Sequence, residues 1–579
     1  MSTFEERRQI YIDVNKECFN INALALKSYN NETMNTDLLN SCINNYINTK
    51  QAKKDNDFNM LLIIRILYLT KHNNYEQNEI LFNTLTTLFK EQQFWLSKNE
   101  QTECFWSENH MIAYLSSWYL WNQYNSFDNS YCEELLNNFL DVKIKYYYYE
   151  FLSQVYNMYT LNSILNIYDF TNNIEIKNKA FKCIQIILQQ FAEGVTLNGT
   201  LYCASGRCYS RCKLSSKANN CNKLLYLLTG LCNETDLSPA GAFFATTSFQ
   251  PDDDYIKNYH TKYERIYTIS HKDNEFKSIY SNLSQTDRTI FQWSAGNYFN
   301  PENIDDTINL MNDYNLWNHA HFKLDPYKTI LKLIPTTVIS SASKTFSVFS
   351  NGSPLCDIKY HLYNHNYYSL SCIENYNRGN LGAQQFPWVA NVGGISVFTQ
   401  SGRISTFGDL PEAIGNSHLP CIKQQENVLM AMYNPSELMK KTSSKSKLDL
   451  KVYLNWSGFD NELRFINNNW FFGEKITNGD TNGNTNGKHV FIAIYSSAGV
   501  KEDTNKNIYN DAEKQGWVAI LSDNTEYNDL TTFKTYVLNN CTVSFNQVKS
   551  KNPFYRLLSI NSYYYGKISF KNIDFDMKW

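Results

Sequence analysis

A change of residue pattern near residue 325 constrains this chain more than any other feature. Before it, apolar residues recur three and four positions apart over long segments, the spacing of helices that bury one face. From about Tyr327 onward, short segments rich in Val, Ile, Phe and Tyr alternate with turn residues, as β-strands do. The sequence therefore predicts a helical domain of residues 1–325 followed by an antiparallel β-sandwich domain of residues 326–579.

Helical spacing is clearest in six segments of the first half. They are residues 57–69, 78–96, 107–124, 132–156, 175–193 and 223–232. Segments of this length joined by polar loops are typical of antiparallel helices stacked as hairpins. We find no sequence repeat of fixed period, so a solenoid is not expected.

Short β-rich segments fill the second half. They are residues 329–340, 344–350, 367–373, 393–400, 427–434, 450–456, 489–496, 516–522, 533–539, 541–546 and 567–571. Their turn-separated succession predicts antiparallel sheets packed as a sandwich. The Asn- and Gly-rich segment Thr477–Lys488 predicts a hairpin tip or an exposed loop.

Charge and hydropathy argue against two kinds of partner. The formal net charge is -3 and charged residues make up 19% of the chain, which speaks against a basic nucleic-acid-binding protein. No apolar run approaches the length of about eighteen residues that a membrane span needs, and the N-terminal residues lack the apolar core of a signal peptide. We therefore expect a soluble, cytoplasmic protein by default, with non-classical export as the alternative. These features leave the oligomeric state open.

The cysteines and histidines do not predict a metal site. Among the 14 cysteines, the densest group runs from Cys203 to Cys232, without a C-x2-C spacing and without an intervening histidine. Free thiols in a reducing compartment are the better interpretation. His319 and His321 would share one face of a strand, but we identify no third ligand for them. We expect no metal and no cofactor.

Polar residues gather at the start of the helix predicted from Ser107. Ser107 is a suitable N-cap residue, and Glu108, Asn109 and His110 follow it in the first turn. A helix start favours negative charge, so these side chains could line an anion site. In the alternative interpretation Asn109 and His110 only solvate the helix start, and Glu108 only complements the helix dipole.

A Gly-, Ser- and Cys-rich segment, Gly194–Lys213, predicts a loop with a second group of candidate residues. Arg207, Tyr209 and Arg211 alternate along it. Two guanidinium groups around a phenol suit the binding of an anion, because arginine pairs bidentately with carboxylates. In the alternative interpretation, these three side chains are exposed surface residues without a functional role.

The β-rich half offers residues that could contact a sugar. Gln384, Gln385 and Trp388 share a turn-rich stretch, where an aromatic ring could cover a sugar face while amides bind hydroxyls. Asn416 and His418 could reach the same ligand from a loop. Burial of Trp388 in the core is the more frequent outcome for this residue type.

Three ordered motifs add a family resemblance that covers most of the chain. They are WSENH at residues 106–110, SGRCYSR at residues 205–211 and LPCIKQQENVLMAMY at residues 419–433. With the order of helical and β-rich halves, they resemble the polysaccharide lyases that join an (α/α) toroid to an antiparallel β-sandwich, the heparinase, chondroitinase and alginate lyase group. The motifs are closer still to a little-characterised set of large bacterial proteins with W-T-E-N-H, S-G-R-x-Y-x-R and L-P-R-x-x-Q-x-x-N-V-L-I-A-L-Y. Ser107 replaces a Thr, and Cys421 replaces an Arg, which removes any charge at that position.

The resemblance implies an incomplete (α/α) toroid of helical hairpins and β-elimination on an acidic, uronate-containing glycan. Asn109 would then stabilise the developing negative charge, and His110 would act as a base. Tyr209 would be the base or acid, with Arg207 and Arg211 stabilising its phenolate or gripping substrate anions. Two alternatives remain: a toroid glycoside hydrolase that uses Glu108, and a non-catalytic glycan-binding or structural protein of the same fold.

Overall fold

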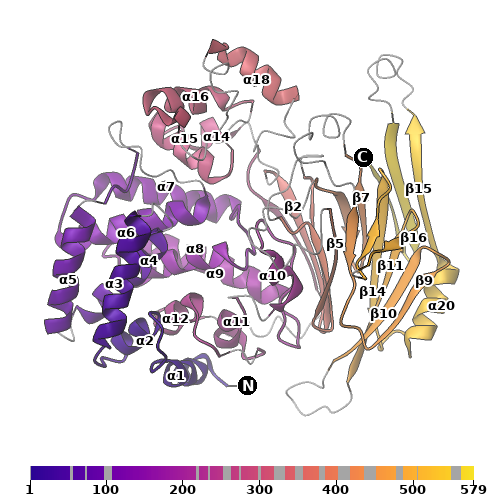
Figure 1. The fold of residues 1–579 in the computed structure, drawn as a ribbon, viewed down its shortest axis with the longest axis horizontal. Helices are drawn as coiled ribbons and strands as arrows, with labels where there is room; N and C mark the ends of the chain where they lie inside the picture. The colour runs from indigo at the N-terminus through magenta and orange to yellow at the C-terminus, as the bar shows by residue number, and fades with distance from the viewer. Residues whose placement is uncertain are drawn as a thin grey trace.

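The computed structural model describes most of the chain. The described residues are 2–51, 56–71, 75–90, 92–96, 107–216, 221–232, 235–251, 263–272, 275–297, 301–318, 333–345, 356–376, 385–401, 418–435, 451–477, 487–504, 506–549 and 562–579. Helices occupy the first part of the chain and layered β-sheets the last part (Figure 1). The predicted order of a helical half and a β-rich half is confirmed.

Five helices form an inner ring of the helical domain. They are α2 (Ala23–Tyr29), α4 (Asn56–Thr70), α6 (Glu108–Asn125), α8 (Tyr156–Phe170) and α12 (Pro239–Ala245). Each packs against the next, and α12 closes the ring on α2. These helices bury most of their circumference, as α4 does with seven buried apolar residues and no exposed residue.

A second set of helices packs on the outside of this ring. They are α1 (Phe4–Asn15), α3 (Thr36–Gln51), α5 (Tyr75–Lys90), α7 (Ser130–Tyr146), α9 (Ile174–Gly194) and α11 (Cys221–Thr229). The outer helix α9 is amphipathic, with Ala180, Ile184 and Ile187 buried on one side. Alternating inner and outer helices make an (α/α) toroid, so the predicted fold class of a helical toroid followed by antiparallel β-sheets is confirmed.

The helix predicted over residues 132–156 is interrupted. α7 ends at Tyr146 because Tyr147 adopts a positive φ of 62°, which a right-handed helix cannot continue. The next residues form a connection, and α8 begins only at Tyr156. This interruption places Glu150 in a loop between the two helices, with consequences for the site described below.

The segment between toroid and sandwich departs from the simple two-part prediction. Strand β1 (Tyr263–Ile269) pairs antiparallel with β2 (Ile358–His365), so a strand of the helical half completes the sheet. A helical group follows β1 and lies at the top of Figure 1: α14 (Phe276–Ile279), α15 (Gln285–Ser294), α16 (Ile304–Asp313), the short η4 (Leu316–Asn318) and α18 (Thr336–Thr345). The strand predicted over 329–340 is therefore wrong from Thr336 onward. The proposed boundary at 325/326 lies outside the described residues.

Two antiparallel sheets form the sandwich. The eight-stranded sheet has the order β1-β2-β3-β4-β5-β8-β13-β12 and the six-stranded sheet the order β6-β7-β14-β11-β10-β9. Further bounds in the first are β3 (Tyr368–Glu374), β4 (Trp388–Val392), β5 (Ile395–Ser401), β8 (Val452–Asn455), β12 (Lys501–Glu502) and β13 (Ile508–Asn510). Those of the second are β6 (Cys421–Gln425), β7 (Val428–Tyr433), β9 (Asn461–Ile466), β10 (Trp470–Thr477), β11 (Lys488–Ser496) and β14 (Gln515–Asp523). The ends of β10 and β11 pair across the expected hairpin of Thr477–Lys488.

A third layer covers the outer face of the six-stranded sheet. It consists of β15 (Cys541–Lys549), β16 (Ser562–Phe570) and β17 (Ile573–Lys578), with helix α20 (Leu530–Asn540). Phe533 and Val537 of α20 are buried against the six-stranded sheet, so the strand predicted over 533–539 is wrong. Its apolar residues Phe533, Tyr536 and Val537 are three and four positions apart, a spacing that fits a helix.

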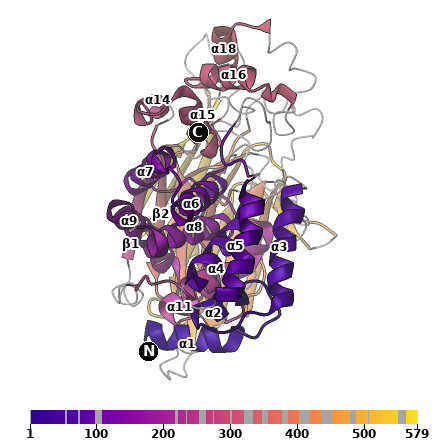
Figure 2. The ribbon, with the colours of Figure 1, turned by 90° about the vertical axis from the view of Figure 1, so that its left-hand side faces the viewer.

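The toroid packs on the free face of the eight-stranded sheet (Figure 1), and in Figure 2 its helices lie in front of the strands. Tyr360 and Leu362 of β2 belong to the toroid core rather than to the core between the sheets. The loop after α9 and the short α10 (Ser210–Leu214) bridge the two parts, because α10 packs against β5. Among the helices that the structure describes, none combines the length and the apolar character that crossing a bilayer requires.

Candidate functional site

Buried side chains and backbone amides of the protein surround the start of α6 and leave no space for a ligand at Glu108. Ser107 has the extended backbone of an N-cap residue but makes no capping hydrogen bond with its side chain. Glu108 is fully buried, forms an ion pair with Lys143, and accepts hydrogen bonds from the amides of Tyr149 at 3.1 Å and Glu150 at 3.2 Å. Glu108 therefore anchors the connection after α7, and the expectation that it contacts a substrate is wrong.

Glu150 supplies the anion that the start of α6 favours. The backbone amide of Asn109 donates to Glu150 Oε2 at 3.1 Å. With its side-chain nitrogen facing the carboxylate, Asn109 also donates to Oε2 at 2.8 Å and to Oε1 at 3.2 Å. Because Asn109 is fully buried, its amide positions Glu150 and does not reach a ligand, contrary to the role expected for it.

His110 lies at the edge of this arrangement. Its Nδ1 is 2.8 Å from Oδ2 of Asp57 on the neighbouring helix α4, and 23% of the His110 side chain is exposed. The carboxylate favours the tautomer that carries the proton on Nδ1 and the lone pair on Nε2. The ring of Phe58 stacks on His110 at 4.8 Å and on Tyr159 at 3.8 Å between centroids, which fixes the imidazole plane.

The SGRCYSR loop approaches Glu150 from the side of the sandwich. Arg207 Nη1 lies 3.0 Å from Glu150 Oε1, and the guanidinium stacks over the ring of Tyr156 at 4.2 Å. The loop is held by paired hydrogen bonds between Ser205 and Phe386, at 3.0 and 3.2 Å. Gly206 passes so close to the connection after α7 that an added Cβ would lie 2.2 Å from Tyr149 O.

Tyr209 lies beside Arg207 on the same loop. It receives a 2.6 Å hydrogen bond from the hydroxyl of Tyr156, and Arg211 lies 4.8 Å above its ring. Burial raises the pKa of Tyr156 above its ordinary value, despite the opposing effect of Arg207, so this phenol stays protonated and donates. The Tyr156 hydroxyl and the Arg211 guanidinium therefore fix the position of the Tyr209 phenol.

One network of contacts thus joins the first two sequence motifs. Glu150 connects Asn109 to Arg207, and Tyr156 connects Arg207 to Tyr209. Burial raises the pKa of Glu150, partly offset by Arg207 and His110. His110, Arg207 and Tyr209 each keep part of their surface exposed, and Arg211 is exposed. The network therefore has a buried carboxylate at its centre and a partly exposed rim of a histidine, a phenol and two guanidinium groups.

The candidates of the β-rich half do not join this network. Trp388 is 1% exposed and donates its indole hydrogen to Thr399 at 2.8 Å, so it belongs to the core of the sandwich and cannot cover a sugar. Gln385 is buried, and its backbone oxygen accepts a hydrogen bond from Lys213 at 2.8 Å. The burial of Trp388 and Gln385 contradicts the sugar contacts expected for them. Gln384 and Asn416 lie outside the described residues, as do His319 and His321.

His418 is also buried, contrary to the expectation that it reaches a ligand. It is 1% exposed, and within the described residues neither ring nitrogen has a hydrogen-bond partner. Burial lowers the pKa of His418 to about 3. Its ring packs edge-on against Tyr433 at 5.5 Å, so His418 is a neutral core residue.

The third motif forms a hairpin rather than part of this site. Residues 421–433 are β6, a two-residue turn and β7. Gln424 ties the two sheets together, because its amide donates to Leu370 O at 3.0 Å and its backbone amide donates to Glu374 at 3.1 Å. The side chains of Glu426 and Asn427, in the turn, line a separate cavity.

Sequence reasoning missed three members of the network: Asp57, Glu150 and Tyr156. Glu150 is the one acidic residue of an aromatic run with helical spacing, and the same spacing predicts Tyr156 at the end of that helix. A single acidic residue among Tyr147, Tyr148, Tyr149 and Phe151 was the one available signal, because an unpaired carboxylate is rarely buried.

No metal centre accompanies the network in the part of the chain that the structure describes. Within it, no group of three or more His, Cys, Asp or Glu side chains could hold a metal ion. The described cysteines of the Cys203–Cys232 group are buried. Burial raises the pKa of the Cys203 thiol to about 12, which makes it a poor nucleophile.

Comparisons with known proteins add little to this geometry. No family model matches the chain, and no curated protein matches it in sequence. Among solved structures, the crystal structure of heparinase III is similar over 94% of this chain and 80% of its own, with 10% identity and a TM-score of 0.28. The relationship is distant. The fold class stated above rests on the helices and sheets of this chain.

Proposed function

We propose that this protein cleaves an acidic, uronate-containing polysaccharide or oligosaccharide by β-elimination, without a metal ion. The observation that carries the proposal is the hydrogen bond from Tyr156 to Tyr209 beside the Glu150–Arg207 ion pair. It places the Tyr209 hydroxyl next to cations suited to a substrate carboxylate. His110 is close enough to the same buried carboxylate to lower its pKa electrostatically.

The reaction has three requirements, and residues of the network can meet each of them. Arg207 and Arg211 would bind the uronate carboxylate, which makes the C5 proton more acidic and replaces the charge neutralisation of a metal. Tyr209 or His110 Nε2 would remove that proton, and its electron pair would form the C4–C5 double bond. The C4–O4 bond would break, and the second of the two groups would protonate O4.

Asn109 and Glu150 take supporting roles in this proposal. Asn109 holds Glu150 through three hydrogen bonds, and Glu150 orients Arg207. An arginine held in one orientation loses less conformational freedom when it binds a carboxylate, so its affinity for the substrate rises. Asp57 does the same for His110 by fixing its tautomer.

Hydrolysis by Glu108 has little support from the geometry. A glycosidase acid must reach the glycosidic oxygen, whereas Glu108 is fully buried and paired with Lys143. A non-catalytic glycan-binding protein would keep the arginine rim without needing the Tyr156–Tyr209 hydrogen bond.

The nature of the product tests the proposal. The chain is incubated with a panel of uronate polymers, and both ultraviolet absorbance and reducing ends are followed. Elimination creates an unsaturated uronate that absorbs in the ultraviolet, so both signals should rise together. Reducing ends without the absorbance would indicate hydrolysis, and glycan binding without either signal would indicate a binding protein; both outcomes would refute elimination.

A further inference from the structure

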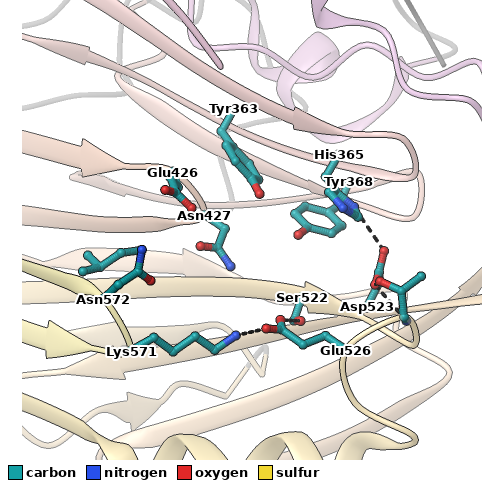
Figure 3. Close-up of a pocket in the computed structure, with 12 residues that line it drawn as sticks. Tyr363, His365, Tyr368, Glu426, Asn427, Ser522, Asp523, Glu526, Lys571 and Asn572 are labelled. Atoms are coloured by element: carbon teal, nitrogen blue, oxygen red, sulfur yellow. Dashed lines mark hydrogen bonds and ion pairs between the residues drawn. The ribbon is translucent and has the colours of Figure 1, made fainter. Parts of the chain in front are cut away.

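A cavity at the junction of the three sheets lies apart from the candidate site. Its volume is about 370 Å³, within the roughly 300–1,000 Å³ range of small-molecule sites. Three hairpins contribute residues to its lining, one from each sheet: β2–β3, β6–β7 and β16–β17. Figure 3 shows side chains from all three layers directed toward the same space.

Aromatic rings form one wall of the cavity. Tyr363, His365 and Tyr368 come from the β2–β3 hairpin, and the rings of His365 and Tyr368 stack at 4.9 Å between centroids. Figure 3 shows the hydroxyls of Tyr363 and Tyr368 pointing toward the interior. Tyr363 and Tyr368 are 3% exposed and the His365 side chain is 20% exposed, so this wall offers phenol groups and the imidazole rather than a broad ring face.

Carboxylates dominate the opposite wall. Asp523 lies 3.1 Å from His365 Nδ1, and Glu526 pairs with Lys571 and accepts a 2.6 Å hydrogen bond from Ser522. Burial acts to raise the pKa of Asp523, but hydrogen bonds from His365 and Thr525 outweigh it and hold this pKa below its usual value. Two of the three lining carboxylates therefore have a basic partner.

Glu426 is the third carboxylate, and it changes the charge balance. Its side chain lines the cavity but forms no ion pair or hydrogen bond with any described residue. It is half-buried at the turn between β6 and β7. An uncompensated carboxylate attracts an ammonium group and repels a ligand carboxylate or sulfate.

We propose that this cavity binds a non-anionic saccharide unit, and an amino sugar more tightly than a neutral sugar. The tyrosine hydroxyls, the amides of Asn427 and Asn572, and the carboxylates can bind sugar hydroxyls as donors and acceptors. Glu426 supplies the preference for an ammonium group. The site is opposite in charge to the arginine rim around Tyr209, and it would hold a part of the glycan that carries no acid group.

Calorimetric titration of the full chain with glucosamine, glucose and glucuronate tests this proposal. Glucosamine should bind most tightly and glucuronate least tightly. Glu426→Gln should weaken glucosamine binding about tenfold, because it removes one charge-assisted hydrogen bond, and should leave glucose binding nearly unchanged. The matched control is Glu134→Gln, which alters an exposed carboxylate of α7 and should change neither.

A second variant keeps the test decisive if Glu426→Gln lowers stability. Asn572 is an exposed turn residue at the cavity, so Asn572→Trp should fill the space and abolish saccharide binding while the thermal unfolding midpoint stays constant. Three results would overturn the proposal. The wild type could fail to bind glucosamine, it could bind glucuronate most tightly, or both variants could bind glucosamine as tightly as the wild type does. Tyr209→Phe should retain glucosamine binding, so the saccharide-site proposal and the lyase proposal can be refuted independently.

Discussion

Arg207 Nη1 lies 3.0 Å from Glu150 Oε1, and this ion pair joins two loops that are 57 residues apart in the chain. Glu150 is held at the start of α6 by Asn109. Through one carboxylate, the helix that carries WSENH is therefore connected to the loop that carries SGRCYSR. The two motifs form a single site because Glu150 lies between them.

The SGRCYSR loop passes close to the toroid at Gly206, so Gly206→Ala should strongly reduce both stability and activity. The new Cβ would lie 2.2 Å from Tyr149 O and 3.2 Å from Glu150 Cα, and backbone atoms cannot give way as a side chain can. We expect a loss of about 1–3 kcal/mol in the free energy of unfolding and loss of glycan cleavage. Gly499→Ala is the matched control, because nothing lies within 4 Å of its added Cβ. Equal stability of the two variants in urea unfolding would refute the close approach.

The raised pKa of Glu150 predicts a pH-dependent effect of Glu150→Gln. The folded state holds this proton more tightly than the unfolded state, so the contribution of Glu150 to stability is largest below its ordinary pKa of 4.5 and falls as pH rises above that value. Glutamine does not ionise, so the stability of Glu150→Gln does not fall for this reason as pH rises. Urea unfolding from pH 4.5 to neutrality should show the stability of Glu150→Gln improving relative to wild type, and the opposite trend would contradict the burial of an ionisable Glu150.

Much of the fold could be predicted from the sequence, because long amphipathic helices and short apolar strands have distinct periods. The segments that became α4, α9, β7 and β11 show this. The prediction failed where a local backbone feature overrides the pattern. The positive φ of Tyr147 interrupts an otherwise continuous helical spacing, and the strand β1 could be recognised only through its pairing with β2, about 90 residues later.

The candidate site was predicted in part. Contacts through Glu150 and Tyr156 connect Asn109, Arg207 and Tyr209, whereas His110 contacts Asp57 and Phe58. Sequence spacing could not reveal Glu150 or Asp57, since both are brought in by tertiary packing. It also could not show that Glu108 and Asn109 face inward, because the first turn of a helix presents residues to every side.

The pairing of Asp57 with His110 predicts a catalytic effect of Asp57→Asn. The amide could accept a hydrogen bond from the same nitrogen only in one orientation and could stabilise the other tautomer in the flipped orientation. If His110 transfers a proton, kcat should fall by about 10²–10⁴-fold with little change in KM. The pH–rate profile should lose the limb that reports His110. An unchanged kcat would exclude a proton-transfer role for His110.

Burial of His418 without hydrogen-bond partners in the described residues predicts that His418→Phe is tolerated. Removing two unpaired nitrogens should leave stability unchanged at neutral pH or raise it by about 1–3 kcal/mol. The folded pKa of about 3 lies below the ordinary 6.5, so wild-type stability is lost as pH falls from 6.5 toward 3. The variant should lose less over this range in thermal unfolding. A steeper acid loss in His418→Phe than in wild type would contradict this burial.

The rate of uronate elimination by Tyr209→Phe tests the central claim most directly. The substitution removes one oxygen, leaves the ring beneath Arg211, and deprives Tyr156 of its 2.6 Å acceptor. With a uronate polymer that the wild type cleaves, we predict that formation of the ultraviolet-absorbing product falls by at least about a hundredfold, while calorimetric affinity for the same polymer changes little. Cleavage by Tyr209→Phe at the wild-type rate would contradict the account.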